Sequence, residues 1–318
     1  MSNDYNSHEL PASNGGNSEI LPDNGPVPNS DENQNDDFLP NRPGKKRNWI
    51  LIAIIALLLL NNFDLTGKLS MFWGKSVNIE ENINDCSHLF LKAKNGSIKA
   101  KGYNGEKIKL TVRYSKSFFG GNVDFKLRKN GKEARLDYDG KVSGLSIEAS
   151  IPYDQFSSMT LQSSNGTIEI KDLNILNTHI KTSNGSVSVD QWTGEKLTIE
   201  TSNGRVNLTD VLGDEAEIKT SNGAIDFKAK EFVKDKEYDY SFKTSNGSIH
   251  LDLPKDNQIA YKIKAKTSNA TIHHNLDHFI GEDDSDSREL SGRTSNYDEA
   301  ATKVNIEMKT SNASITID

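Results

Sequence analysis

The chain has 318 residues and a formal charge of −7, and residues 1–44, with eight acidic side chains and one basic one, account for that whole charge. A neutral body behind an acidic segment argues against a nucleic-acid partner, which would require a basic stripe on the protein. The single cysteine, Cys86, excludes both an intrachain disulfide and a cysteine-based zinc site.

The N-terminal segment, residues 1–44, is rich in Asn, Ser, Pro, Gly and Asp and has almost no aromatic or branched residues. Such a segment cannot bury enough apolar surface to offset the entropy lost on ordering, so we expect a disordered acidic tail. A simple solvated extension and a regulatory, partner-binding tail are both compatible with this composition, and the first is favoured.

Residues 45–65 are predicted to form a signal-anchor transmembrane helix. Three cations at positions 45–47 precede twelve uninterrupted apolar residues, from Trp49 to Leu60. That run is short for a membrane span, but the flanking cations and the interfacial tryptophan favour a membrane helix over a buried core helix. The long preceding segment argues against a cleavable signal peptide. We therefore expect a single-pass cell-membrane protein with a cytoplasmic N-terminus and an extracellular C-terminal domain.

The chain from residue 80 to 318, behind an expected linker at 66–79, is organised by a repeated Thr-Ser-Asn-Gly motif. The first four motif asparagines follow one another at intervals of 19 residues, and later steps are 24, 23 and 43. A near-constant period of this length indicates stacked coils, because one repeat cannot bury its own apolar face. The motif asparagines are Asn165, Asn184, Asn203, Asn222, Asn246, Asn269 and Asn312.

Each coil can be numbered from its motif asparagine as position 0. Apolar residues recur at −4, +3 and +5, as at Leu161 and Ile168, and polar residues separate them. This alternation predicts two short strands per coil, each with one face inward. Leu173, Trp192 and Val211, at +8, add a third inward contact. We therefore predict an all-β fold, a parallel β-solenoid with coils of about 19 residues.

The Asn-Gly pair lies between the two strands and is predicted to form a corner. Asn and Gly tolerate the left-handed backbone conformation, and stacked Asn, Ser and Thr side chains can hydrogen-bond from coil to coil. A structural role thus explains the motif without a ligand. The Asn-x-Ser/Thr triplets at these corners are interpreted in the same way, rather than as glycosylation acceptors.

Residues 75–160 are less regular and are interpreted as the N-terminal cap and first coils, with Asn95 marking a divergent coil. Strands are predicted at 107–114, 123–127, 134–138 and 145–151, with an Asn-Gly hairpin turn at 130–131.

The run Leu-Ser-Ile-Glu-Ala-Ser-Ile-Pro-Tyr at 145–153, and the run Met-Thr-Leu-Gln-Ser-Ser-Asn-Gly-Thr-Ile-Glu-Ile at 159–170 with its successors, resemble the bacterial "putative adhesin" β-solenoid family of unknown function. The resemblance covers residues 80–318. It implies a domain displayed behind one membrane helix, similar to members from cell-envelope-stress operons. The family contributes no catalytic residues.

No hydrolase, metalloprotease, phosphate-loop or dinucleotide motif occurs in the sequence, so we expect neither enzymatic activity nor a cofactor. Some solenoids cleave glycans with paired carboxylates, but Glu169 and Asp226 fall near the outward +4 position of non-adjacent coils. A metal site at His274, Asp277 and His278 is conceivable. The preferred alternative is an irregular coil with exposed histidines.

The best candidate for a ligand surface is a set of lysines at position −3. Stacked coils would align them into a basic stripe suited to an anionic cell-wall polymer or lipid headgroups. The plainer explanation is that lysine protects exposed strands and keeps the surface soluble. The lysines are Lys92, Lys181, Lys219, Lys243, Lys266 and Lys309.

The last strand, 314–318, is predicted to end the solenoid without a cap. An open strand edge could pair with a second copy of the chain or with another envelope protein, unless the insertion at 277–300 folds over it. The leading functional hypothesis is a binding, adhesion or scaffolding module at the bacterial envelope. The alternatives are a solenoid carbohydrate-active enzyme and an accessory membrane protein of an envelope-stress signalling system.

Overall fold

The computed structural model describes residues 74–117, 121–283 and 288–318. The predicted tail (1–44) and the predicted anchor (45–65) lie outside the described residues. Within these ranges no helix is long and apolar enough to cross a membrane. The first strand, β1 (Lys75–Glu81), pairs with a later strand, so the folded body begins five residues before the predicted boundary at residue 80.

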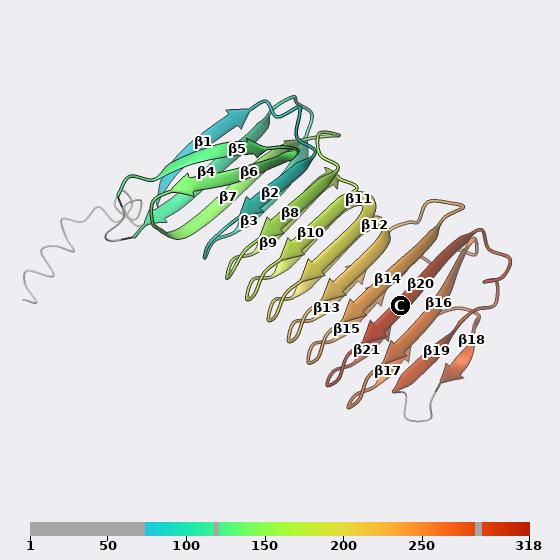
Figure 1. Cartoon of the computed structure of the whole chain (residues 1–318). Coiled ribbons are helices and arrows are strands. Elements are labelled where there is room, and N and C mark those ends of the chain that lie inside the picture. The colour runs from blue at the N-terminus through green and yellow to red at the C-terminus, as the bar shows by residue number, and fades with distance from the viewer. Residues whose placement is uncertain (1–73, 118–120, 284–287) are drawn as a thin grey trace, which may run out of the picture. The chain divides into compact units, whose positions relative to one another are not determined.

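The strands form two ladders (Figure 1). Their inward side chains share one hydrophobic core. In the coils that carry the motif, the strands before the motif asparagines build the leading ladder and the strands after them build the trailing ladder. The order across the leading ladder is β5 (Asp124–Asn130), β6 (Glu133–Asp139), β2 (His88–Lys92), β8 (Ser158–Gln162), β10 (Asn177–Lys181), β11 (Val187–Glu200), β12 (Val206–Lys219), β14 (Glu237–Lys243), β20 (Thr302–Lys309), β16 (Ile259–Lys266), β19 (Glu289–Thr294) and β18 (Phe279–Asp283).

The trailing ladder contains the first halves of β11 and β12, which continue from one ladder into the other. Its order is β1, β4 (Ile108–Lys116), β7 (Val142–Pro152), β3 (Ile98–Tyr103), β9 (Ile168–Asn174), β11, β12, β13 (Ile225–Lys228), β15 (Ile249–Asp252), β21 (Ile315–Ile317) and β17 (Ile272–His274).

Equivalent residues of successive coils pair in parallel register, which confirms the predicted stacking. At position −4, Ile180 pairs with Leu161 on one side and with Ile199 on the other, and all three are fully buried. At +3, Val187 pairs with Ile168 and Val206 in the same way. The alternation in each strand therefore produces continuous apolar columns, because residues at the same coil position point to the same face.

The third inward contact is also present. Leu173, Trp192 and Val211 stack in register and are buried, and the Trp192 indole N–H donates to Thr178 Oγ1 at 3.0 Å. A buried indole usually finds such a partner.

The motif corner contains two hydrogen-bonded ladders. On the outside, the Nδ2 of each motif asparagine donates to the Oδ1 of the asparagine in a neighbouring coil, as from Asn203 to Asn184 at 2.6 Å. The series runs Asn95, Asn165, Asn184, Asn203, Asn222, Asn246, Asn312 and Asn269. Beneath it, the buried Thr201 hydroxyl donates to Gly185 O and accepts from the Gly204 N–H.

The prediction of a left-handed backbone at this corner holds for Asn95, whose φ is 53°. It is wrong for the asparagines and glycines of the later coils. Positive φ angles occur instead at position +7, at Asp172, Gln191 and Asp210, just before the third inward contact. The motif glycine is needed for space: a Cβ on Gly204 would lie 1.8 Å from the Gly185 carbonyl oxygen. Where glycine stacks on glycine, the coils are too close to admit a side chain, whereas the two coils of Asn312 and Asn269 carry Ala313 and Ala270 at this position.

The coil order departs from the chain order at both ends of the stack. The coil of β2 and β3 lies between the coil of β6 and β7 and the coil of β8 and β9, although β6 and β7 come later in the chain than β2 and β3. At the other end, β20 lies between β14 and β16, and β21 lies between β15 and β17 (Figure 1). The prediction of an open edge at 314–318 is therefore wrong, because β21 is paired on both sides.

The strands predicted before residue 160 are confirmed as β4, β5, β6 and β7. The predicted hairpin joins β5 to β6, with Asn130 opposite Glu133 and a positive φ at Gly131. The antiparallel strands β1 and β4, next to β7, and β5, next to β6, flank the parallel coils at this end. At the opposite end, β19 and β18 add an antiparallel hairpin to β16.

Candidate functional site

The position −3 lysines lie in one outward column of the leading ladder, but in an order that the chain does not suggest. Lys219 pairs with Lys243, Lys243 with Lys309, and Lys309 with Lys266. These four residues, on β12, β14, β20 and β16, are termed the lysine segment. The other two predicted members, Lys92 and Lys181, are separated from it by Gln162 and Glu200.

Glutamates partly neutralise this column. Lys243 pairs with Glu307 at 2.8 Å, Lys266 with Glu289 at 2.7 Å, and Lys181 with Glu200 at 2.7 Å. Lys219 pairs with Glu217. In the described ranges Lys309 has no ion pair. All these pairs are exposed, so each contributes little to stability and can exchange partners.

The lysine pairs also affect the titration of two carboxyls. The hydrogen bond from Lys219 holds the pKa of Glu217 below the usual range of glutamate, and the hydrogen bond from Lys181 does the same for Glu200. Burial opposes both shifts. Both carboxyls are therefore ionised at neutral pH.

A shallow groove of about 480 Å³ runs between the lysine column and the motif corner. It combines ammonium groups with hydroxyls, which together can bind phosphate oxygens. Its lining residues are Glu200, Thr201, Lys219, Thr220, Ser221, Lys243, Thr244 and Ser245.

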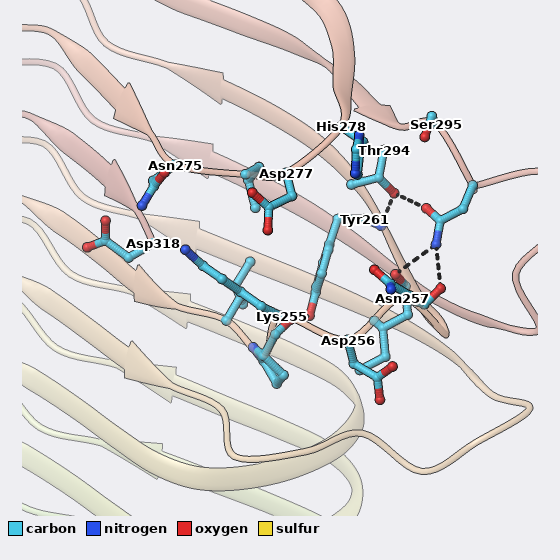
Figure 2. A pocket seen from close by; sticks show the side chains of 15 residues that line it. Lys255, Asp256, Asn257, Tyr261, Asn275, Asp277, His278, Thr294, Ser295 and Asp318 are labelled. Carbon is cyan, nitrogen blue, oxygen red and sulfur yellow. Dashed lines mark hydrogen bonds between the residues drawn. The ribbon is translucent and has the colours of Figure 1, made fainter.

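A more enclosed pocket of about 310 Å³, termed the end pocket, lies where the segments after β15, β17 and β19 meet (Figure 2). Tyr261 supports it: its hydroxyl donates to Pro254 O at 2.7 Å, and its N–H donates to Thr294 Oγ1 at 3.1 Å. Asn296 closes one side by donating to the carbonyls of Asn257 and Ile259. Burial raises the pKa of Tyr261, so its phenol stays protonated.

The structure divides the predicted metal candidates. Asp277 and His278 line the end pocket, and His278 has a left-handed φ of 54°. His274 lies on β17, where the centroid of its ring is 5.0 Å from the ring centroid of Phe279. Across the described part of the chain, no group of three His, Cys, Asp or Glu side chains is placed to hold a metal ion.

The carboxylates weighed for glycan cleavage stay apart. Glu169 and Asp226 occupy the same outward column of the trailing ladder, with Ser188 and Asn207 between them. Each faces a cation: Glu169 lies 2.9 Å from Lys99, and Asp226 lies 3.2 Å from Arg205.

A third concavity, which the sequence did not predict, crosses the outer face of β14, β20 and β16. It has a volume of about 650 Å³ and lies beside Tyr297, in the turn that precedes β20. We term it the Tyr297 groove. Its residues at position −7, Asp239, Asn305 and Lys262, are neighbours only because β20 enters the stack between β14 and β16. Chain order alone could not bring them together.

Stacked parallel coils with apolar columns and an asparagine corner define a β-solenoid of the repeat class. The chain belongs to the Toastrack DUF4097 family, whose model matches residues 74–318. This match confirms the family predicted from the sequence, a domain family of unknown function.

Three solved structures are similar to this chain. A putative cell adhesion protein from Clostridium sporogenes has 13% identity and a TM-score of 0.31, covering 76% of this chain and 98% of that one. A putative adhesin from Bacteroides fragilis has 11% identity and a TM-score of 0.34, with 77% and 97% covered. A putative adhesin from Parabacteroides distasonis has 8% identity and a TM-score of 0.28, with 77% and 98% covered. No curated protein matches the chain.

Proposed function

We propose that this protein is a membrane-anchored, extracytoplasmic binding module that holds an anionic polymer of the bacterial cell envelope. The proposal is carried by one observation: four lysines from four adjacent strands stand in register as the lysine segment. Adjacent strands are about 4.8 Å apart, so the segment presents a row of ammonium groups roughly 14 Å long. An extended polymer of phosphodiesters can follow such a row.

The charge of this face supports the proposal. Positions −3 and −5 of β12, β14, β20 and β16 hold five lysines and two glutamates. The glutamates are exposed partners, and a phosphate can replace an exposed carboxylate at small cost. The solenoid backbone is fully paired beneath the row, so little further ordering is needed when a polymer binds.

The predicted anchor at 45–65, which begins with three cations, supplies the location. The tail would then be cytoplasmic and the Toastrack domain would face the cell wall. Protease treatment of intact cells tests this orientation. The domain is expected to be digested while an epitope on residues 1–44 is protected, and the reverse pattern would overturn it.

Binding is tested with the purified full-length chain and poly(glycerol phosphate). The double variant Lys243→Gln/Lys309→Gln is expected to weaken binding about tenfold and to lower its salt dependence, because two ammonium–phosphate contacts are lost. The matched control is Lys92→Gln/Lys181→Gln, which removes the same charge from the same column outside the lysine segment. Equal loss in both variants, or no binding by the parent chain, would contradict the proposal.

A further inference from the structure

The Tyr297 groove has a hydrogen-bonded floor. Asn305, on β20, donates from Nδ2 to Glu237 Oε1 at 2.9 Å and to Asp239 Oδ1 at 3.0 Å. Its Oδ1 accepts a hydrogen bond from the Tyr297 hydroxyl at 2.5 Å. Burial, followed by the nearby carboxylates, raises the pKa of Tyr297, so the phenol keeps the proton that it donates. The network fixes both carboxylates along one side of the groove.

The two sides of the groove carry opposite charges. Glu237 and Asp239 project from β14, and Lys262 and Lys264 project from β16, with β20 between them. Glu307 of β20 also lines the groove, but its carboxylate is paired with Lys243 at 2.8 Å. The sides are two strand spacings apart, about 10 Å between Cα atoms. Among the residues that the structure describes, none of these four side chains forms an ion pair with another residue. An amide donor orients a carboxylate but does not neutralise it, so both sides retain their charge.

The groove lies beside the lysine segment. Lys264 is two residues before Lys266 on β16, and Asp239 is four residues before Lys243 on β14, so both surfaces share the same three strands. A polymer that follows the lysine segment passes the open side of the groove. The carboxylate side would repel a purely anionic polymer there, because like charges facing each other disfavour association.

We propose that the Tyr297 groove recognises a zwitterionic repeat unit of an anionic polymer, one that carries a primary ammonium group beside its phosphate. The ammonium binds Glu237 and Asp239, and the phosphate binds Lys262 and Lys264. This inference rests on the proposed function, since it names the chemistry that the envelope polymer must carry.

The test compares poly(glycerol phosphate) carrying alanyl esters, whose amino groups are free, with the same polymer after mild alkaline removal of the esters. Removal makes the polymer more negative. If lysines alone bind it, the stripped polymer binds more tightly. If the groove recognises the ammonium group, the stripped polymer binds the full-length chain about tenfold more weakly, through loss of a charge-assisted contact. The two mechanisms therefore predict opposite changes in affinity when the esters are removed.

The double variant Glu237→Gln/Asp239→Asn keeps the shape of the groove and removes its negative charge. It is expected to abolish the preference for the esterified polymer and to bind the stripped polymer more tightly than the parent chain does. The matched control is Glu106→Gln/Glu195→Gln, which removes two exposed carboxylates outside the groove and should retain the preference.

Tighter binding of the stripped polymer by the parent chain would overturn the groove inference and leave the proposed function intact. A preference that survives Glu237→Gln/Asp239→Asn would also overturn it. Failure of both polymers to bind would instead contradict the proposed function. The two proposals are therefore separated by the same set of measurements.

Discussion

The motif glycines leave no space for a side chain toward the neighbouring coil. Each would place a Cβ within about 2 Å of a carbonyl oxygen in the neighbouring coil, as at Gly185, Gly204, Gly223 and Gly247. None of these glycines has a positive φ, so close approach is the reason for glycine here.

Gly204→Ala is accordingly expected to destabilise the domain by about 1–3 kcal/mol, because two coils must separate to admit the methyl group. Urea unfolding measures the change. Gly121→Ala is the control, since a Cβ there meets no atom within 4 Å. Similar unfolding midpoints for the two variants would contradict the close-packing explanation.

The two hydrogen-bonded ladders of the motif corner should contribute unequally to the free energy of unfolding. Thr201 is buried and satisfies one N–H and one carbonyl, whereas Asn203 is exposed to water. Replacing a buried hydroxyl leaves both partners unsatisfied, at about 1–3 kcal/mol each, while an exposed hydrogen bond is largely replaced by water.

Thr201→Val is therefore expected to lower the free energy of unfolding more than Asn203→Ala does, although valine keeps the shape of threonine. The comparison is made by chemical denaturation at one pH and salt concentration. The opposite ranking would show that the outer asparagine ladder, and not the inner threonine ladder, holds the corner.

At the scale of the strand, alternation sends one set of side chains to the core and the other to a charged face. The outward faces of β11 and β12 carry Glu200 and Glu217, whose pKa values are lowered by hydrogen bonds from lysines. The Glu217 carboxylate competes with an external anion for the ammonium group of Lys219, which belongs to the lysine segment.

This competition predicts a pH dependence of polymer binding. As the pH falls through the lowered pKa of Glu217, this carboxyl becomes neutral and releases Lys219, a member of the lysine segment. Phosphodiesters stay ionised in that range, so affinity for poly(glycerol phosphate) is expected to rise. The lowered pKa of Glu217 places the contribution of this carboxyl to the rise below the usual titration range of glutamate.

Titrating the affinity at constant ionic strength, with circular dichroism to confirm folding, measures this effect. The variant Glu217→Gln has no carboxylate to titrate at Lys219. It should bind more tightly than the parent at neutral pH and gain less on acidification. Falling affinity at low pH in a folded protein would contradict the competition.

At the scale of the whole molecule, the unexpected feature is the position of the last coil. β21 exchanges hydrogen bonds with β15 and with β17, including Leu253 N to Asp318 O at 2.8 Å and Asn275 N to Ile317 O at 2.8 Å. Ile315 and Ile317 are fully buried between the corresponding residues of those strands. The final strand is thus an internal part of the core.

Deleting residues 314–318 is expected to remove amide hydrogen-exchange protection from β15 and β17 while β9 and β10, several coils away, keep theirs. The reason is that solenoid stability is transmitted mainly between nearest neighbours. The full-length variant Thr316→Ala, which changes an outward side chain of the same strand, is the control. Unchanged protection of β15 and β17 would contradict the observed coil order.

Particular residues show how far prediction from sequence reached. The inward position of Ile180, Val187 and Trp192 followed from local alternation, and the asparagine ladder followed from the repeat. The left-handed residues Asp172 and Gln191 were missed, because neither residue type is specific for that conformation. The Tyr297 groove was also missed, since Asp239 and Asn305 are separated by 66 residues.

The strands of the regular coils, the inward columns, the position of the corner and the family could be predicted from sequence, because they depend on patterns contained within one coil. The order in which the coils stack could not be predicted and is seen only in the folded structure. All coils present similar inward residues and the same corner, so many orders of stacking would bury comparable apolar surface. The long segment between β17 and β20, with its own hairpin, lets the chain return and place β20 and β21 inside the stack. That placement assembles both the lysine segment and the Tyr297 groove.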